Sequence, residues 1–292
     1  MQPFTLNLHG RVVAYDRPVV MGIINATPDS FYAGSRVSEP EAIGQRARQM
    51  LADGADMLDL GAYSSRPGGA DVPAEEEMRR LEYALKAIRA AVGDDVPVSV
   101  DTFRADVARR CVAEWGADIV NDISGGTLDE LMFVTVAELR CPYLLMHMRG
   151  TPATMQTLTN YDCVTADVIA ELSRSLWTLA ELGVGDVIVD PGFGFAKTLE
   201  QNYELMSHLD AFGILGKPVL VGVSRKSMIT KLLDIPADDA LVPTAVLGAY
   251  ALDRGASVLR VHDVKAARQS VVLYEKLKTA ISNQETGEYK GV

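Results

Sequence analysis

The sequence has few cysteines and lacks any long uninterrupted apolar run. Cys111, Cys141 and Cys163 are odd in number and form no Cys-x-x-Cys pair, which favours a reducing compartment over a disulfide framework. No stretch reaches the roughly 18 apolar residues of a transmembrane helix. The N-terminal residues, MQPFTLNLHG, also lack the basic and apolar regions of a signal peptide. We therefore expect a cytoplasmic protein without a membrane-spanning segment.

Positive charge is scarce. The chain has 28 Lys and Arg residues against 39 Asp and Glu residues, a formal net charge of −11. Nucleic acids and anionic membranes bind proteins largely through neutralisation of phosphate charge, so this balance argues against both partners. A site for an anionic ligand would have to be basic locally.

What the chain does have is a regular alternation of apolar runs and helical segments. Its composition, 48% hydrophobic and 23% charged over 292 residues, is that of a globular protein. Eight short runs rich in β-branched residues read as buried parallel strands; they cover residues 19–25, 56–62, 97–101, 118–122, 142–148, 186–190, 218–224 and 257–263. Segments with helical periodicity lie between them, at about 73–92, 103–115, 161–182, 199–209, 238–254 and 264–282.

This alternation, without a Pro/Ser-rich linker, predicts an α/β fold of the (β/α)8 TIM barrel type. We expect one domain over residues 1–282, with a short N-terminal hairpin at 3–15 below the barrel and a disordered C-terminal tail at 283–292. The alternative is an open doubly wound sheet, but no G-x-G-x-x-G turn follows the first strand.

Polar residues end most of the predicted strands. In a barrel the carboxyl ends of the strands hold the active site. Alternate strand residues face opposite sides, so these side chains are expected to share the inward face with the ones two positions earlier. The residues concerned are Asn25, Asp101, Asn121, Asp190, Ser224, Lys226, Arg260 and His262.

Each of these residues also has a purely structural interpretation. Asp101 could cap the following helix, and Asp190 could start a turn with Pro191. So many on one rim are hard to assign to capping alone. Lys226 is the clearest case, because a cation in the first turn of a helix opposes the helix dipole unless an anion binds there.

Two loops are rich in polar and turn-forming residues. NATPDSF follows the first predicted strand, and SSRPGG, which contains Arg66, follows the second. An arginine near a mouth that already holds Lys226 and Arg260 is unfavourable unless an anion arrives. We expect both loops to act as lids that exclude water.

Taken together, these segments identify a family. NATPDSF, SSRPGG, SVDT, NDISGG, LMHMRGTPATMQ, DPGFGFAK, GVSRKSMI and RVHDV occur in this order. Over about residues 4–275 the chain resembles the dihydropteroate synthases, transferases of folate (tetrahydrofolate) biosynthesis and targets of sulfonamides. The resemblance implies a (β/α)8 barrel that joins 6-hydroxymethyl-7,8-dihydropterin pyrophosphate to p-aminobenzoate. The products would be 7,8-dihydropteroate and pyrophosphate, formed by a dissociative mechanism.

The resemblance also implies a role for individual residues. The pterin would be held by Asp101, Asn121, Asp190, Lys226, Met146 and Ile123. Asn25, Arg260 and His262 would bind the diphosphate, with Mg2+ as the cofactor shared between its oxygens and Asn25. The p-aminobenzoate pocket would consist of Ser65, Arg66, Pro67, Phe195, Lys226 and Ser227. Catalysis would depend on Asp101, Lys226, Asn25 and Arg66, with Asp101 stabilising a pterin-methyl cation. Members of the family are commonly homodimers.

Two of these residues have a structural alternative that the sequence leaves open. Met146 could be ordinary barrel core, and His262 could be a structural histidine, although it shares the inward face with Arg260.

The chain departs from the family pattern in both loops. Ala33 stands where an Asp is common, Tyr63 where a Glu is common and Ser65 where a Thr is common. None of these changes affects the residues expected to bind pterin or diphosphate. Two alternative functions stay open: a pterin-binding corrinoid methyltransferase, and a pterin-binding homologue in which the loop changes have removed catalytic activity.

Overall fold

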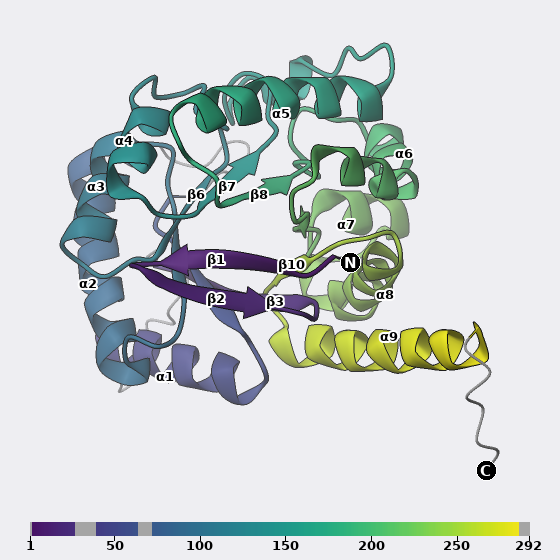
Figure 1. Ribbon diagram of the computed structural model, residues 1–292, viewed down its shortest axis with the longest axis horizontal. Helices are drawn as coiled ribbons and strands as arrows, with labels where there is room; N and C mark the ends of the chain where they lie inside the picture. Colours follow the sequence, from purple (N-terminus) through teal and green to yellow (C-terminus); the bar gives the residue numbers. More distant parts are fainter. Residues whose placement is uncertain (1, 27–38, 64–71, 286–292) are drawn as a thin grey trace.

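A computed structural model describes residues 2–26, 39–63 and 72–285. Eight parallel strands form a ring in the order β8-β7-β6-β5-β4-β3-β10-β9 (Figure 1). They are β3 (Val19–Asn25), β4 (Met57–Gly61), β5 (Val98–Asp101), β6 (Ile119–Asp122), β7 (Tyr143–Met146), β8 (Val187–Asp190), β9 (Leu220–Val221) and β10 (Val258–Val261). A parallel bridge between Val189 and Val219 joins the two ends of this order. The structure confirms all eight predicted strands and the TIM barrel.

Helices surround the strands. They are α1 (Glu39–Ala52), α2 (Ala74–Val92), α3 (Ala105–Ala113), α4 (Met132–Leu139), α5 (Val164–Glu181), α6 (Leu199–Ser207), α7 (Ser227–Leu233), α8 (Leu241–Asp253) and α9 (Val264–Glu285). α9 reaches past residue 282, and residues 286–292 of the expected tail lie outside the described residues. Within the described ranges, no helix combines the length and hydropathy needed to cross a membrane.

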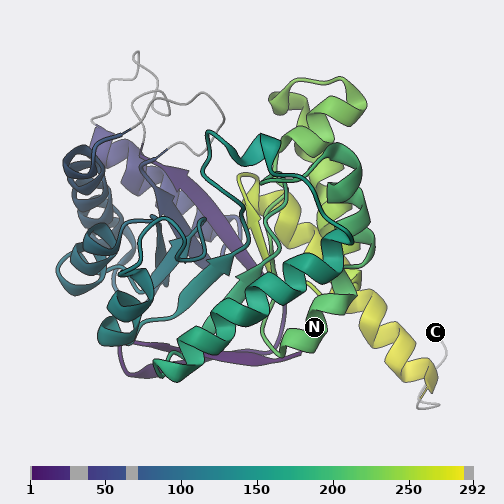
Figure 2. The ribbon, with the colours of Figure 1, turned by 90° about the horizontal axis from the view of Figure 1, so that it is seen from above.

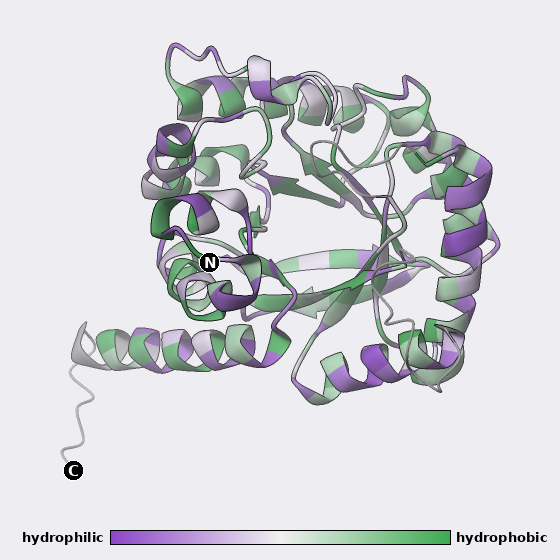
Figure 3. Ribbon diagram, turned by 180° about the vertical axis from the view of Figure 1, so that it is seen from behind, coloured by the Kyte–Doolittle hydropathy of each residue, from purple (hydrophilic) through white to green (hydrophobic). Residues whose placement is uncertain are grey.

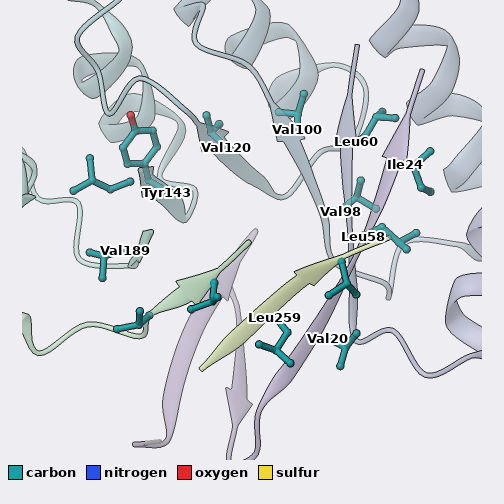
Figure 4. Packing of buried hydrophobic residues seen from close by; sticks show 14 of the residues in the cluster. Val20, Ile24, Leu58, Leu60, Val98, Val100, Val120, Tyr143, Val189 and Leu259 are labelled. Carbon is teal, nitrogen blue, oxygen red and sulfur yellow. The ribbon is translucent and has the colours of Figure 1, made fainter. Parts of the chain in front are cut away.

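The main core lies between the strands and the helices. Val98 and Val100 of β5 and Leu259 of β10 belong to it, as the alternation of residues along these strands predicts (Figure 4). The intervening residues, such as Ser99 and Arg260, face the interior of the barrel, where both donate hydrogen bonds to the Asp59 carboxylate. The predicted inward and outward faces are therefore confirmed for these strands.

The predicted N-terminal hairpin closes one end of the barrel. β1 (Phe4–Leu8) and β2 (Arg11–Tyr15) pair antiparallel and lie across the barrel opening (Figure 1), beneath the strands when seen from the side (Figure 2). Their side chains join a second core with inward residues from seven barrel strands; its members are Leu6, Leu8, Val19, Met21, Met57, Ile119, Leu144, Ile188, Leu220 and Val258. The opposite end, where the strands finish, is left for the site.

Candidate active site

Strand register places the predicted polar residues side by side on one rim. Asn25 pairs with Gly61, Gly61 with Asp101, and Asp101 with Asn121. Further round the ring Met146 pairs with Asp190. Because the strands are parallel and in register, these side chains emerge at the same level of the barrel mouth.

A charged cluster lies just inside this rim. Arg260 of β10 donates from Nε to Asp59 Oδ2 at 2.6 Å and from Nη2 to Asp101 Oδ2 at 2.9 Å. Asn121 Nδ2 lies 3.2 Å from both oxygens of Asp59, and Ser99 Oγ donates to the same carboxylate. Four strands thus contribute to one hydrogen-bonded group in which Asp59 is fully buried.

Asp59 was missed by the sequence analysis, although a signal was present. It stands in the middle of the apolar run DMLDLGA, two residues after Met57, which faces the barrel interior. A carboxylate at that position must be paired, since an isolated buried charge is very unfavourable. Its partner is Arg260, which the sequence analysis counted among the cations that make the mouth basic. The structure instead balances Arg260 with two carboxylates.

The charge of Asp101 is subject to opposing influences. Burial raises the pKa of Asp101, and the nearby Asp59 carboxylate acts in the same direction, whereas the Arg260 guanidinium favours the ionised form. The ion pair with Arg260 therefore stabilises the ionised form of Asp101, which burial disfavours.

Lys226 and Asp190 form the second polar group of the mouth. Lys226 precedes α7 as its N-cap, and its Nζ donates to the Phe193 carbonyl at 2.6 Å. The ammonium also lies 4.7 Å from the centroid of the Phe195 ring. Burial lowers the pKa of Lys226 to about 8, and Asp190 opposes this shift. Burial likewise raises the pKa of Asp190, whose Oδ1 accepts from the Gly192 amide at 2.7 Å.

An apolar wall adjoins these polar groups. Ile123, Met146 and Phe195 belong to one buried cluster, together with Met148, Met155 and Ala196. Met146 is therefore next to the rim residues rather than inside the closed core that the hairpin covers. The position of Ile123 is fixed by its neighbour Asp122, whose carboxylate accepts from Ser124, Gly126 and Tyr143 and so holds the following turn.

His262 and Ser227 lie at the edge of the same mouth. Ser224 Oγ and His262 Nδ1 are 3.0 Å apart, and the His262 amide donates to the same hydroxyl at 3.2 Å. Ser227 is exposed at the first position of α7, directly after Lys226.

The predicted loop residues Ser65, Arg66 and Pro67, and the departure at Ala33, lie outside the described residues. Tyr63 is within them. Its ring meets Phe103 edge-on, with centroids 5.2 Å apart, and the Arg104 guanidinium lies 5.6 Å from its centroid. Tyr63, which replaces the usual acidic residue, is therefore part of an aromatic and cationic cluster.

Among the described residues, no group of three or more His, Cys, Asp or Glu side chains is arranged to hold a metal ion. Asn25 Oδ1 and Asp101 Oδ2 both lie within 4 Å of the position that a Cβ at Gly61 would occupy, and Gly61 pairs with both residues in the sheet.

Comparison with known proteins agrees with this arrangement. Residues 21–262 match the family described as pterin binding enzyme. The chain is 43% identical over 257 residues to a dihydropteroate synthase of Synechocystis, covering 87% of this chain and 88% of that protein. The Xanthomonas albilineans dihydropteroate synthase solved with 4-aminobenzoic acid has a TM-score of 0.86 and 36% identity, over 94% of this chain and 98% of that one. The Yersinia pestis dihydropteroate synthase in a sulfonamide drug complex has a TM-score of 0.85 and 35% identity, over 94% and 100%.

Proposed function

The chain belongs to the pterin-binding enzyme family and is a transferase of the dihydropteroate synthase type. We propose that it binds a pterin pyrophosphate and p-aminobenzoate at the barrel mouth and joins them there. The observation that supports the assignment most strongly is the juxtaposition of the Asp101–Asn121 rim, the Asp190–Lys226 pair and the apolar wall at one barrel mouth. Such a mouth suits a flat heterocycle with a polar edge.

The pterin is proposed to lie among Asp190, Asn121 and Lys226, with its faces against Met146 and Ile123. A carboxylate accepts hydrogen bonds from amino and ring N–H groups, an amide both donates and accepts, and an ammonium only donates. These three side chains can therefore satisfy both the donors and the acceptors of a pterin edge. Their burial makes recognition selective, since an unpaired buried polar group costs about 1–3 kcal/mol.

The diphosphate is proposed to bind Asn25, His262 and Arg260. Nε and Nη2 of Arg260 donate to the two carboxylates, so Nη1 is the part of this guanidinium that we assign to a phosphate oxygen. The negative charge of the diphosphate would then approach a cation already balanced by Asp59 and Asp101. Because Arg260 is already balanced by these carboxylates, we infer that a further positive charge offsets the negative charge of the bound diphosphate.

Mg2+ supplies that charge in our proposal. The Asn25 amide oxygen and the nearby Asp101 carboxylate oxygen are hard oxygen donors of the kind that Mg2+ prefers. Because Mg2+ usually takes most of its remaining ligands from water and substrate phosphates, Asn25 is the chain's proposed ligand. When bound, the ion would neutralise charge on the leaving pyrophosphate.

The p-aminobenzoate is proposed to bind beside Phe195, Lys226 and Ser227. The Phe195 ring offers a surface for the aryl ring, and Ser227 can donate to a carboxylate at the exposed N-terminal end of α7. Ser65, Arg66 and Pro67, outside the described residues, are proposed as the other wall of this pocket, as the sequence predicts.

In the reaction we propose, the bond between the pterin methylene carbon and the diphosphate oxygen breaks, and its electron pair leaves with pyrophosphate. The ionised Asp101 carboxylate stabilises the resulting cation. The arylamine nitrogen then forms the new C–N bond and loses a proton. Lys226 and Phe195 orient the incoming ring, while Arg260 keeps Asp101 ionised until the cation forms.

A homodimer is proposed through α8 and α9. Both helices expose large apolar side chains: Leu241, Val242, Val246, Tyr250, Val272, Leu273, Leu277 and Ile281. Along α9, apolar (green) and polar bands alternate in Figure 3. Sedimentation of wild type at the dimer mass, and of Leu273→Glu at the monomer mass, would support this assembly. A wild-type monomer at micromolar concentration would contradict it. The cytoplasmic location stays a prediction from the sequence.

The function is tested by product analysis. Purified protein with pterin pyrophosphate, p-aminobenzoate and Mg2+ should form 7,8-dihydropteroate, detected by mass spectrometry. Methyl transfer from methyltetrahydrofolate to cob(I)alamin without dihydropteroate would favour the corrinoid methyltransferase instead. Binding of the pterin pyrophosphate without either product would favour an inactive homologue.

A further inference from the structure

Lys197, at the end of the loop that follows β8, is a buried lysine outside the groups assigned so far. Its side chain is almost fully buried. Nζ lies 3.1 Å from the Gly192 carbonyl, 3.0 Å from the Phe195 carbonyl and 3.0 Å from His147 Nδ1. The nearby Glu171 carboxylate pairs with His147 and Arg149 instead. Burial lowers the pKa of Lys197 to about 7. Its protonated form has three donors, one for each of these three neutral acceptors.

The partners of His147 determine its protonation. The ionised Glu171 carboxylate can only accept, so His147 Nε2 carries the ring proton and donates to it at 2.9 Å, and Nδ1 of the neutral ring accepts from Lys197. Burial lowers the pKa of His147 to about 4, which agrees with a neutral ring. Arg149 in turn donates to Glu171 from Nε and Nη2. Lys197 is thus held by a chain of contacts that reaches the protein surface.

Lys197 and Lys226 hold the same short loop. Lys197 binds the carbonyls of Gly192 and Phe195, and Lys226 binds the carbonyl of Phe193 between them. Gly192 packs closely against the His147 backbone, because a Cβ at this position would lie 1.9 Å from the His147 carbonyl oxygen, so only glycine fits there. At Gly192 φ is +73°, a conformation that glycine adopts without strain.

We propose that Lys197 is a positioning residue of the p-aminobenzoate pocket. Through the Phe195 carbonyl it fixes the ring that faces the aryl substrate, and through the shared loop it fixes the Phe193 carbonyl that orients Lys226. His147 and Glu171 keep Lys197 in place. This inference rests on the proposed function, because it assumes that Phe195 and Lys226 bind the arylamine.

The test is a comparison of Lys197→Met with Lys217→Met. Methionine keeps an apolar stem of similar length and removes all three donors. Lys217, which precedes β9, is a matched control, because its Nζ also donates to a backbone carbonyl, that of Gly185, but in a solvent-exposed hydrogen bond. We expect Lys197→Met to raise the KM for p-aminobenzoate by about tenfold or more, and Lys217→Met to leave it within about twofold. A lowered melting temperature with an unchanged KM would show a merely structural role and overturn the proposal.

Two further measurements keep the test decisive. Glu171→Gln changes a partly exposed residue, so it covers the case in which Lys197→Met does not fold. We expect a rise of about threefold in the same KM, and no rise would count against the proposal.

Hydrogen exchange of residues 191–198 and 223–228 requires no substrate. Faster exchange in both segments of Lys197→Met, but not of Lys217→Met, would support positioning. This readout does not depend on activity: a wild type that releases no pyrophosphate would refute the proposed function but not the positioning role. Unchanged exchange in both segments would refute positioning.

Discussion

At the scale of single residues, the charge balance around Arg260 decides what the mouth can bind. Asp59 and Asp101 both accept from this guanidinium, so removal of either carboxylate changes more than one contact. Asp59 is fully buried, whereas Asp101 is at the rim. We therefore expect their substitutions to have different effects, one on stability and the other on turnover.

Asp59→Asn is expected to lower the free energy of unfolding by about 3 kcal/mol, because it removes one partner of a buried ion pair. Urea unfolding measures this value. Glu82→Gln breaks the exposed pair with Lys86 on α2 and should change it by less than about 0.5 kcal/mol. A loss below about 1 kcal/mol in Asp59→Asn would contradict the importance assigned to this pair.

Asp101→Asn is expected to reduce kcat by about 100-fold or more, since charge stabilisation of the cation is lost. The affinity for pterin pyrophosphate, measured by calorimetry, should change by less than about fivefold because an amide keeps an acceptor oxygen. Asp95→Asn, at an exposed carboxylate paired with Arg11, is the control. Equal losses of turnover and affinity would argue against the proposed role of Asp101.

Lys226 and Asp101 together predict a bell-shaped pH dependence of kcat/KM. Burial lowers the pKa of Lys226 to about 8, so the required ammonium is lost as the pH rises through 8. Burial raises the pKa of Asp101, so its required anion is lost on acidification at a pH above the usual carboxyl value of about 4.

Rate measurements between about pH 5 and 10, with both substrates varied, test these limbs. In Lys226→Arg the alkaline limb should disappear, because a guanidinium stays charged throughout this range. An alkaline limb that persists unchanged in the variant would assign it to another group.

At the scale of elements, the barrel separates stability from function. The hairpin β1–β2 fills the end opposite the site, with Leu6 almost completely buried among inward residues of the strands. In TIM barrels this amino-terminal face contributes stability rather than chemistry.

Leu6→Ala is therefore expected to lower the free energy of unfolding by about 3 kcal/mol and to leave both KM values within about twofold. Val12→Ala, on the same hairpin but 69% exposed, should change stability by less than about 0.5 kcal/mol. A large change in KM for Leu6→Ala would show that the two ends of the barrel are coupled.

Strand periodicity made most of the architecture predictable. A near-continuous apolar run such as residues 19–25 identifies a buried strand. The alternation of valines with polar residues at 98–101 assigns Ser99 and Asp101 to the interior. α4 was not predicted, because it is a short helix of MFVTVAEL with two β-branched valines, a threonine and no side-chain cap. Local sequence gives a weak signal for such a helix, and packing against the barrel decides it.

The same limit applied to the site. Asn121 and Asp190 were found because they lie at or next to the carboxyl ends of their strands. Asp59 and Lys197, in contrast, act through partners that are distant in sequence. Lys197 is 50 residues from His147, and Asp59 is 201 residues from Arg260. Only the closed ring of strands brings such residues together.

At the scale of the whole molecule, the net charge of −11 does not describe the mouth. Within the described residues the mouth combines Lys226 and a neutralised Arg260 with Asp101 and Asp190. Such a balanced mouth suits a substrate that arrives with its own charge and a divalent cation. The family membership and the polar rim therefore lead to one central claim, that this chain transfers a pterin-methyl group from pyrophosphate to an arylamine.

The most direct test of that claim is the rate of pyrophosphate release by purified wild-type protein with pterin pyrophosphate and Mg2+, in the presence and absence of p-aminobenzoate. We predict sustained release that requires the arylamine for turnover and equals the rate of dihydropteroate formation. No release above the rate of Asp101→Asn, with intact binding of the pterin pyrophosphate, would contradict the account.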